Sequence, residues 1–149
     1  LCVGQINLRN VMNIDEARTA IIQTIGRVNT LYQGVVFDEW VLVKLASGPG
    51  MILSYHGPRA DTYKARFLAD INSLQTEVGR TPLQLGDFVF THGADGTHFD
   101  ACMRIGPACY LFCNHTTKPM SEIRQNPLWL NAQKPFAELG AKFQADPVV

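Results

Sequence analysis

Two histidines, an aspartate and a cysteine lie within one short stretch of the chain and could do chemistry together. They are His98, Asp100, Cys113 and His115. Imidazole nitrogens and a thiolate are favoured zinc ligands, and a thiolate beside a histidine is also a pair used in nucleophilic catalysis. The group therefore suggests a metal site or a thiol nucleophile at Cys113. The competing interpretation is a half-exposed sheet face on which His and Asp meet water and Cys packs under a helix.

Whether these side chains meet depends on the hairpin that carries them. Gly106-Pro107 suits a type II′ turn between strands 97–105 and 108–115, with glycine supplying the positive φ. A two-residue turn fixes the register of the two strands. It predicts a polar face with the pairs His98–His115, Asp100–Cys113, Cys102–Leu111 and Arg104–Cys109. The opposite, core face would carry Phe99, Ala101, Met103, Ile105, Ala108, Tyr110 and Phe112.

A second turn gives an independent test of where the apolar side of this sheet lies. Asp95-Gly96 suits a type I′ turn between strand 85–92 and strand 97–105. That turn places Phe88 and Phe90 on the same face as Ala101 and Met103. Because the two turn assignments agree on the apolar face, the sequence predicts a three-stranded antiparallel meander.

Other candidate motifs are weaker. The turn GADG at 93–96 opens a strand and lacks the Lys-Ser/Thr ending of a phosphate-binding loop. Asp38 and Glu39 are neighbours in a strand and point to opposite faces, so we expect them at a solvated edge. Cys102, Cys109 and Cys113 lie in apolar runs without zinc-like spacing, which predicts small buried hydrophobes in a reducing compartment. The sequence predicts no metal and no cofactor.

Further elements follow from hydrophobic spacing and from breakers. Asn13 and Glu16 predict a capped helix that ends before Gly34, and Pro58 to Gly79 predicts a second helix. Apolar residues on both faces of 36–46 predict a central strand, followed after Ser47-Gly48-Pro49-Gly50 by a strand over 51–57. The tail from 120 to 143 should be helical and restart at each proline. Its expected inward residues are Trp129, Leu130, Phe136, Leu139 and Phe143.

Size and charge limit the function classes. The chain has 149 residues, 46% hydrophobic and 17% charged, with 13 basic and 13 acidic residues. This predicts one domain with no electrostatic attraction to nucleic acid. No apolar run approaches a membrane span, and no basic-then-apolar leader precedes a small-residue cleavage site, so we expect a cytoplasmic protein without membrane insertion.

The order helix, strand, strand, helix, strand, strand, strand, helix resembles the Roadblock / dynein light chain family of the profilin-like class. The resemblance spans 13–143, and its anchors are IDEARTAIIQTIG, GVVFDEWVLVKLASGPGMILSY and THGADGTHFDACMRIGPACYLFCNHT. It implies an α+β fold with a five-stranded antiparallel sheet and helices on both faces. The first and last helices would share one face, and the helix at 58–79 would cover the other. Residues 1–12 would then be an N-terminal extension and 144–149 a frayed tail.

The resemblance also implies a function. Such domains pair through the second helix and the neighbouring edge strand, and act without catalysis as scaffolds or regulators of small Ras-like GTPases. Carried onto this sequence, the interface would use Tyr63, Phe67, Ile71 and Leu74, with backbone pairing at Phe88 and Phe90. The extension and the proline-interrupted last helix depart from the family, and added segments can cover or replace an interface.

Three hypotheses therefore remain open at this point. The first is a non-enzymatic homodimeric interaction module, and an apolar patch on the surface would support it. The second is a ligand- or metal-binding sensor that uses the face of His98, His115 and Cys113. The third is a small thiol enzyme built on Cys113, which requires a thiol that ionises readily.

Overall fold

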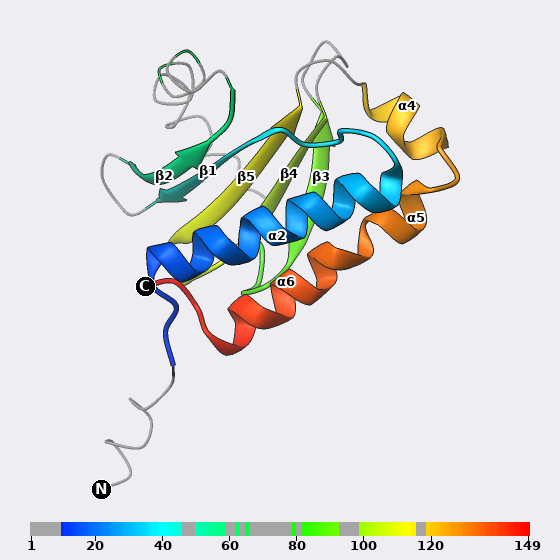
Figure 1. The fold of residues 1–149 in the computed structure, drawn as a ribbon. Coiled ribbons are helices and arrows are strands. Elements are labelled where there is room, and N and C mark those ends of the chain that lie inside the picture. Colours follow the sequence, from blue (N-terminus) through cyan, green and yellow to red (C-terminus); the bar gives the residue numbers. More distant parts are fainter. Residues whose placement is uncertain are drawn as a thin grey trace, which may run out of the picture.

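The computed structural model has an α+β fold built on a five-stranded antiparallel sheet (Figure 1). It describes residues 10–45, 50–58, 62, 65, 79, 82–92, 99–115 and 119–149, with the backbone alone at 91, 92, 99, 115 and 120. The strands are β1 (Glu39–Lys44), β2 (Met51–His56), β3 (Phe88–His92), β4 (Phe99–Arg104) and β5 (Cys109–His115). Their order is β2-β1-β5-β4-β3, so β2 and β3 form the two outer strands.

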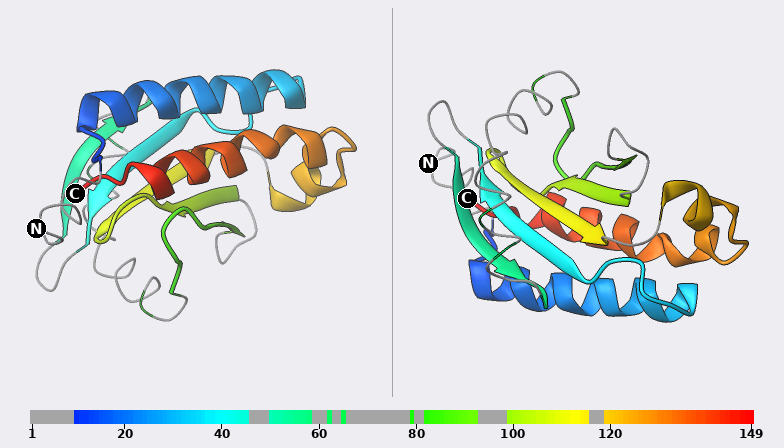
Figure 2. Two further views of the ribbon diagram at one scale, coloured as in Figure 1. Left: turned by 90° about the horizontal axis from the view of Figure 1, so that it is seen from below. Right: turned by 90° about the horizontal axis from the view of Figure 1, so that it is seen from above.

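The described helices lie on one face of the sheet. They are α2 (Ile14–Tyr32), α4 (Met120–Gln125), α5 (Trp129–Ala132) and α6 (Lys134–Ala145). Figure 2 shows α2 and α6 side by side along that face, and α5 continues the α6 layer. The expected pairing of the first and last helices on one face is therefore present. The predicted helix over 58–79 lies outside the described residues, apart from helical backbone at 62, 65 and 79.

Local signals set the limits of α2 as the sequence predicts. The Asn13 side chain accepts a hydrogen bond from the Glu16 N–H at 2.9 Å and donates one to the Glu16 carboxylate at 2.6 Å. The first bond satisfies a backbone N–H that a bare helix start leaves unpaired, and the second joins the two side chains. At the other end Gln33, with φ of 62°, takes the left-handed conformation just before Gly34.

The central strand has two apolar faces, as the sequence predicts. Trp40 and Leu42 enter the core beneath the helices, whereas Val41 and Val43 enter a second cluster on the opposite face. All four are 1% exposed or less. The strand is shorter than predicted because Asn29 of α2 binds the backbone of 36–37 and holds that segment outside the sheet.

The two predicted hairpin registers had opposite outcomes. Between β3 and β4, Phe88 pairs with Met103 and Phe90 with Ala101, which confirms the register expected from Asp95-Gly96. The turn itself lies outside the described residues. Between β4 and β5 the prediction was wrong by one residue, since Ala101 pairs with Cys113. The observed pairs are Asp100–Asn114, Cys102–Phe112, Met103–Leu111 and Arg104–Tyr110.

The shift reverses the faces of β5. Cys109, Leu111 and Cys113 enter the core beneath the helices, while Tyr110 and Phe112 join the cluster on the other face. A slip of one residue always has this effect, because side chains alternate along a strand.

The cause is the connection from β4 to β5, which is one residue longer than a two-residue turn. Ile105 donates to the Cys109 carbonyl at 2.9 Å, so Gly106, Pro107 and Ala108 form the loop. Gly106 is not among the described glycines with positive φ. A Cβ at Gly106 would lie 1.7 Å from the Val148 carbonyl oxygen. This glycine is required by the close approach of the C-terminal tail, and the II′ interpretation was wrong.

That tail is ordered, which corrects the expectation of fraying at 144–149. Helix α6 continues to Ala145, and Val148 is 1% exposed. The Val148 N–H donates to the Ile105 carbonyl at 2.9 Å, and the Met12 N–H donates to the Pro147 carbonyl at 2.9 Å. The tail therefore links the segment before α2 to the end of β4.

The C-terminal helical region restarts after its prolines, as predicted. Pro127 lies just before α5, and Pro135 lies in the first turn of α6, where its missing N–H costs nothing. Trp129, Phe136, Leu139 and Phe143 are buried as expected. Leu130 was predicted inward but is 75% exposed, because the short α5 turns only one side to the core.

Candidate functional site

The outer strand β3 presents one side of its backbone away from the sheet. The Gly86 N–H donates to the Arg104 carbonyl at 2.8 Å, and the Arg104 N–H donates to the Asp87 carbonyl at 3.0 Å. Backbone groups alternate in direction along a strand. The backbone at 89 and 91 therefore faces β4, and that at Phe88 and Phe90 faces away from it.

The side chains of Phe88 and Phe90 are held by the helix layer. The Phe88 and Phe90 rings lie 5.8 and 5.7 Å from the Phe136 ring of α6, and Phe90 lies 5.1 Å from Trp129 of α5. Both side chains are partly buried against the main core. They fix the position of β3, and the backbone at these two residues faces away from the sheet. Of the six predicted interface residues, Tyr63, Phe67, Ile71 and Leu74 lie outside the described residues.

The other outer strand is contacted by a side chain of α2. Arg18 donates to the Ser54 hydroxyl and to the Tyr55 carbonyl, the latter at 3.2 Å. The Arg18 guanidinium lies 5.3 Å from the centre of the Trp40 ring. The Leu45 N–H donates to the Ala108 carbonyl, on the side of β1 that faces β5. Because backbone groups alternate in direction along each strand, Trp40 and Leu42 then face their partners His56 and Ser54 of β2. Tyr55 lies between these two partners, so its backbone faces away from β1. Arg18 therefore forms a hydrogen bond with a carbonyl group on the outer side of β2.

The predicted metal group is divided by the observed register. Cys113 packs in the core beneath the helices, whereas Asp100, paired with Asn114, points to the opposite face. His98 lies outside the described residues, and His115 is described by its backbone alone, paired with Phe99. Among the described residues no three His, Cys, Asp or Glu side chains are grouped to hold a metal ion. The predicted opposition of Asp100 and Cys113 was wrong.

The described cysteines are buried free thiols, as predicted. Burial raises the pKa of the Cys102 thiol to about 12 and also raises the pKa of Cys109. For Cys113, burial is the main cause of a pKa well above the usual range, and negative charge at Cys102 and Asp100 adds to it. A thiol nucleophile needs the opposite shift.

We therefore expect these thiols to resist alkylation in the folded protein. With iodoacetamide at pH 7.5, Cys102, Cys109 and Cys113 should stay unmodified over a time that fully labels the urea-unfolded chain. Peptide mapping by mass spectrometry measures each site separately. Rapid modification of native Cys113 would contradict this prediction and return attention to the thiol-enzyme hypothesis.

A polar row not predicted from the sequence crosses three strands on the face opposite the helices. Asn114 of β5 pairs with Glu39 of β1 and with Asp100 of β4. Glu39 is 1% exposed, so its expected place at a solvated edge was wrong. Within the described part of the chain, the buried Asn114 Oδ1 accepts no hydrogen bond. No sequence signal predicts this row, because its members come together only through the register.

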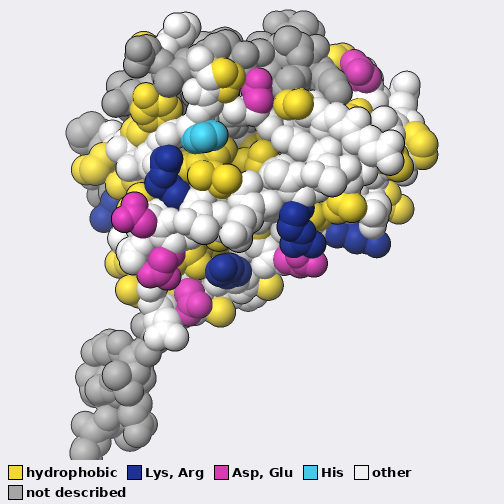
Figure 3. All heavy atoms as spheres, viewed as in Figure 1, with side chains coloured by type: hydrophobic (Ala, Val, Ile, Leu, Met, Phe, Trp, Pro, Cys, Tyr) yellow, Lys and Arg dark blue, Asp and Glu magenta, His cyan; other side chains and the backbone are white. Residues whose placement is uncertain are grey.

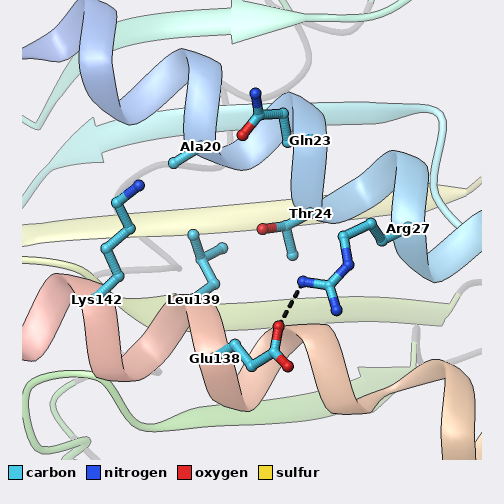
Figure 4. A pocket seen from close by; sticks show the side chains of 7 residues that line it. All are labelled: Ala20, Gln23, Thr24, Arg27, Glu138, Leu139 and Lys142. Atoms are coloured by element: carbon cyan, nitrogen blue, oxygen red, sulfur yellow. Dashed lines mark hydrogen bonds and ion pairs between the residues drawn. The ribbon is translucent and has the colours of Figure 1, made fainter.

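A shallow groove of about 200 Å³ runs between α2 and α6 (Figure 4). It is lined by Ala20, Gln23, Thr24, Arg27, Glu138, Leu139 and Lys142. One end is closed by the ion pair between Arg27 and Glu138, whose side chains are 56% and 60% exposed. The hydrogen bond and charge of Arg27 lower the pKa of Glu138. The pair therefore stabilises the fold above the ordinary carboxyl pKa and loses that effect as pH falls through the lowered value, although an exposed pair contributes little.

The helix-covered surface shows no concentration of one charge. Figure 3 shows basic and acidic side chains interspersed among the coloured residues of this face. In the described part of the chain, no helix is long and apolar enough to cross a membrane.

Comparison with known proteins finds a likeness among solved structures alone. No protein-family model matches the chain, and no curated protein matches it significantly. Among solved structures, the chain is similar to an IclR transcriptional regulator from Alicyclobacillus acidocaldarius. The identity is 12% and the TM-score 0.38, over 85% of this chain and 67% of the other. A likeness this distant carries no argument about function.

Proposed function

We propose that this chain is a non-catalytic, homodimeric interaction module that serves as a scaffold or regulator of a small Ras-like GTPase or a signalling complex. The observation that carries the proposal is the outward-facing backbone of β3 at Phe88 and Phe90. An outer strand of this kind is a template for pairing with another chain. In a homodimer the same strand of each copy would pair across a two-fold axis.

The two outer strands differ in a way that favours β3 as the pairing edge. Arg18 already binds a carbonyl on the outer side of β2. The β3 sequence FVFTH contains neither proline nor lysine, the residues that commonly prevent pairing at an edge. Its two phenylalanines pack inward and hold the strand in place.

The sheet order supports the Roadblock-like interpretation of the sequence. In the order β2-β1-β5-β4-β3, the strand that follows the predicted helix over 58–79 is an outer strand. That helix and β3 can then contribute to one continuous surface, with Tyr63, Phe67, Ile71 and Leu74 as its proposed helical part. The GTPase partner belongs to the same proposal and rests on the resemblance. The cytoplasmic location is also proposed, and it rests on the cysteines without zinc-like or disulfide-like spacing.

The first test is the mass of the protein in solution. We expect a dimer, near twice 16.5 kDa, by size exclusion with light scattering at micromolar concentration under reducing conditions. Phe67→Asp should yield a monomer, because an unpaired charge in a buried interface is strongly destabilising. A wild-type monomer would contradict the proposal.

A backbone substitution tests the β3 edge itself. By the alternation established above, the His92 N–H faces away from β4, whereas that of Thr91 faces β4. His92→Pro should therefore leave the fold intact and weaken the dimer, since proline is tolerated on the outer side of an edge strand. Thr91→Pro is the matched control and should lower stability by removing a ladder bond. A His92→Pro protein that remains a tight dimer would exclude this edge as the interface.

The proposed partner is tested with purified proteins. We expect the wild-type dimer to bind a member of a panel of small Ras-like GTPases with different affinities for the GDP-loaded and GTP-analogue-loaded states, measured by calorimetry. Equal affinity for the two nucleotide states throughout the panel, or no binding at all, would remove the GTPase from the proposal. The proposed dimer would still be tested separately by its mass in solution.

A further inference from the structure

We propose that the groove between α2 and α6 binds a small oxyanion, the carboxylate or phosphate group of a small molecule, between Thr24 and Lys142. This site is separate from the β3 edge and does not depend on the proposed dimer. Its first support is a threonine hydroxyl. Thr24 is 7% exposed, lines the groove, and has no hydrogen-bond partner among the described residues.

The position of that hydroxyl points to a ligand. Thr19, on the same helix, donates its hydroxyl to the Asp15 carbonyl at 3.1 Å, which is the usual way a helical threonine is satisfied. Thr24 makes no such bond; Figure 4 shows its hydroxyl directed into the groove. The Thr24 hydroxyl is thus available to donate a hydrogen bond within the groove. A ligand oxygen in the groove would accept this hydrogen bond.

The charge of the groove selects the class of ligand. Arg27 and Lys142 are basic and Glu138 is acidic. Glu138 pairs with Arg27, and in the described part of the chain Lys142 has no ion-pair partner. Figure 4 shows the Lys142 side chain reaching from α6 toward α2, at the opposite end from that ion pair. An oxyanion lying between Thr24 and Lys142 would contact the Lys142 ammonium group, the Thr24 hydroxyl and the Gln23 amide.

The size of the groove selects a small ligand. Its volume of about 200 Å³ is below the range of roughly 300–1,000 Å³ typical of pockets for drug-sized molecules. The floor between the charged residues is formed by Ala20 and Leu139. Such a site suits one carboxylate or phosphate group with a short apolar attachment.

The test is an NMR titration of the full chain with two probes, inorganic phosphate and acetate, each at constant ionic strength set with chloride. We expect saturable amide shifts at Gln23, Thr24, Leu139 and Lys142, for at least one probe, below about 10 mM. Saturation by phosphate alone or by acetate alone identifies which oxyanion the site prefers.

Four variants make the assignment specific. Lys142→Gln should weaken binding about tenfold, and Thr24→Val several-fold, because each removes one donor. Thr24→Val keeps the shape of the side chain, so it removes the hydroxyl without opening a cavity. Glu138→Gln should tighten binding several-fold, since it removes the competing carboxylate. Lys134→Gln is the matched control on α6, outside the groove, and should leave binding unchanged.

Two results would overturn the proposal. The first is the absence of saturable shifts at the groove residues in the wild-type chain with both probes. The second is equal weakening by Lys134→Gln and Lys142→Gln, which would show general charge attraction. Both results are independent of the dimer mass, so failure of this site and failure of the proposed interface are distinguishable.

Discussion

Gly140→Ala is expected to lower the free energy of unfolding by about 2 kcal/mol, which is the net of a packing clash and a gain in helix propensity. A Cβ at Gly140 of α6 would lie 2.2 Å from the Gly86 carbonyl oxygen, and a Cβ at Gly86 would lie 2.6 Å from that of Gly140. Both neighbours are backbone atoms, so no side chain can rotate away. Helix and loop must separate, and the loop carries the Gly86 to Arg104 bond that starts β3.

Gly26→Ala is the matched control for this substitution. Gly26 lies within α2, and a Cβ there would meet nothing within 4 Å. Because alanine is the better helix former, this variant should gain roughly 0.5–1 kcal/mol. Thermal unfolding measures both: a loss of 2 kcal/mol corresponds to a Tm lowered by roughly 4–8 °C in a chain of this size. Equal stability of Gly140→Ala and Gly26→Ala would show that α6 does not pack against Gly86.

Phe136→Ala is expected to have the largest effect on stability, a loss of about 3–5 kcal/mol, as for other buried aromatic truncations. Phe136 is 1% exposed, and its ring lies 5.6 Å from Phe37, 5.8 Å from Phe88 and 5.7 Å from Phe90. The substitution opens a cavity between α6 and the sheet. Since β3 is held by these contacts, its amides should also exchange faster with solvent than those of β1.

Leu130→Ala serves as the control from the neighbouring helix α5. Leu130 is 75% exposed, so its truncation should change the free energy of unfolding by no more than about 0.5 kcal/mol. Urea denaturation followed by tryptophan fluorescence gives both values. A small loss for Phe136→Ala, similar to that of Leu130→Ala, would contradict the observed aromatic core.

Features encoded within a few neighbouring residues were predictable from the sequence. The cap of α2 depends on Asn13 and Glu16 alone, and the helical restarts depend on Pro127 and Pro135. The two apolar faces of β1 follow from alternation within one strand. Each of these signals acts over a single turn or strand, so no knowledge of distant contacts is needed.

Features set by distant contacts were not predictable in the same way. Gly106 signals a tight turn by itself, yet it is glycine because Val148 approaches it from the far end of the chain. A two-residue turn at Gly106-Pro107 shifts the predicted register by one residue. It therefore exchanges the predicted faces of β5 and places Asp100 opposite Cys113, which the structure does not. The groove between α2 and α6 likewise unites Thr24 with Lys142, and no local pattern joins the two.

The bond between Met12 and Pro147 has a consequence for how the protein is made. A ribosome delivers residue 12 long before residue 147, so this contact cannot form until residue 147 has emerged. The helix α2 can acquire its local structure early, but the segment before it has to wait for a partner that is synthesised late. Closure of the two segments on the end of β4 therefore follows synthesis of all five strands of the sheet.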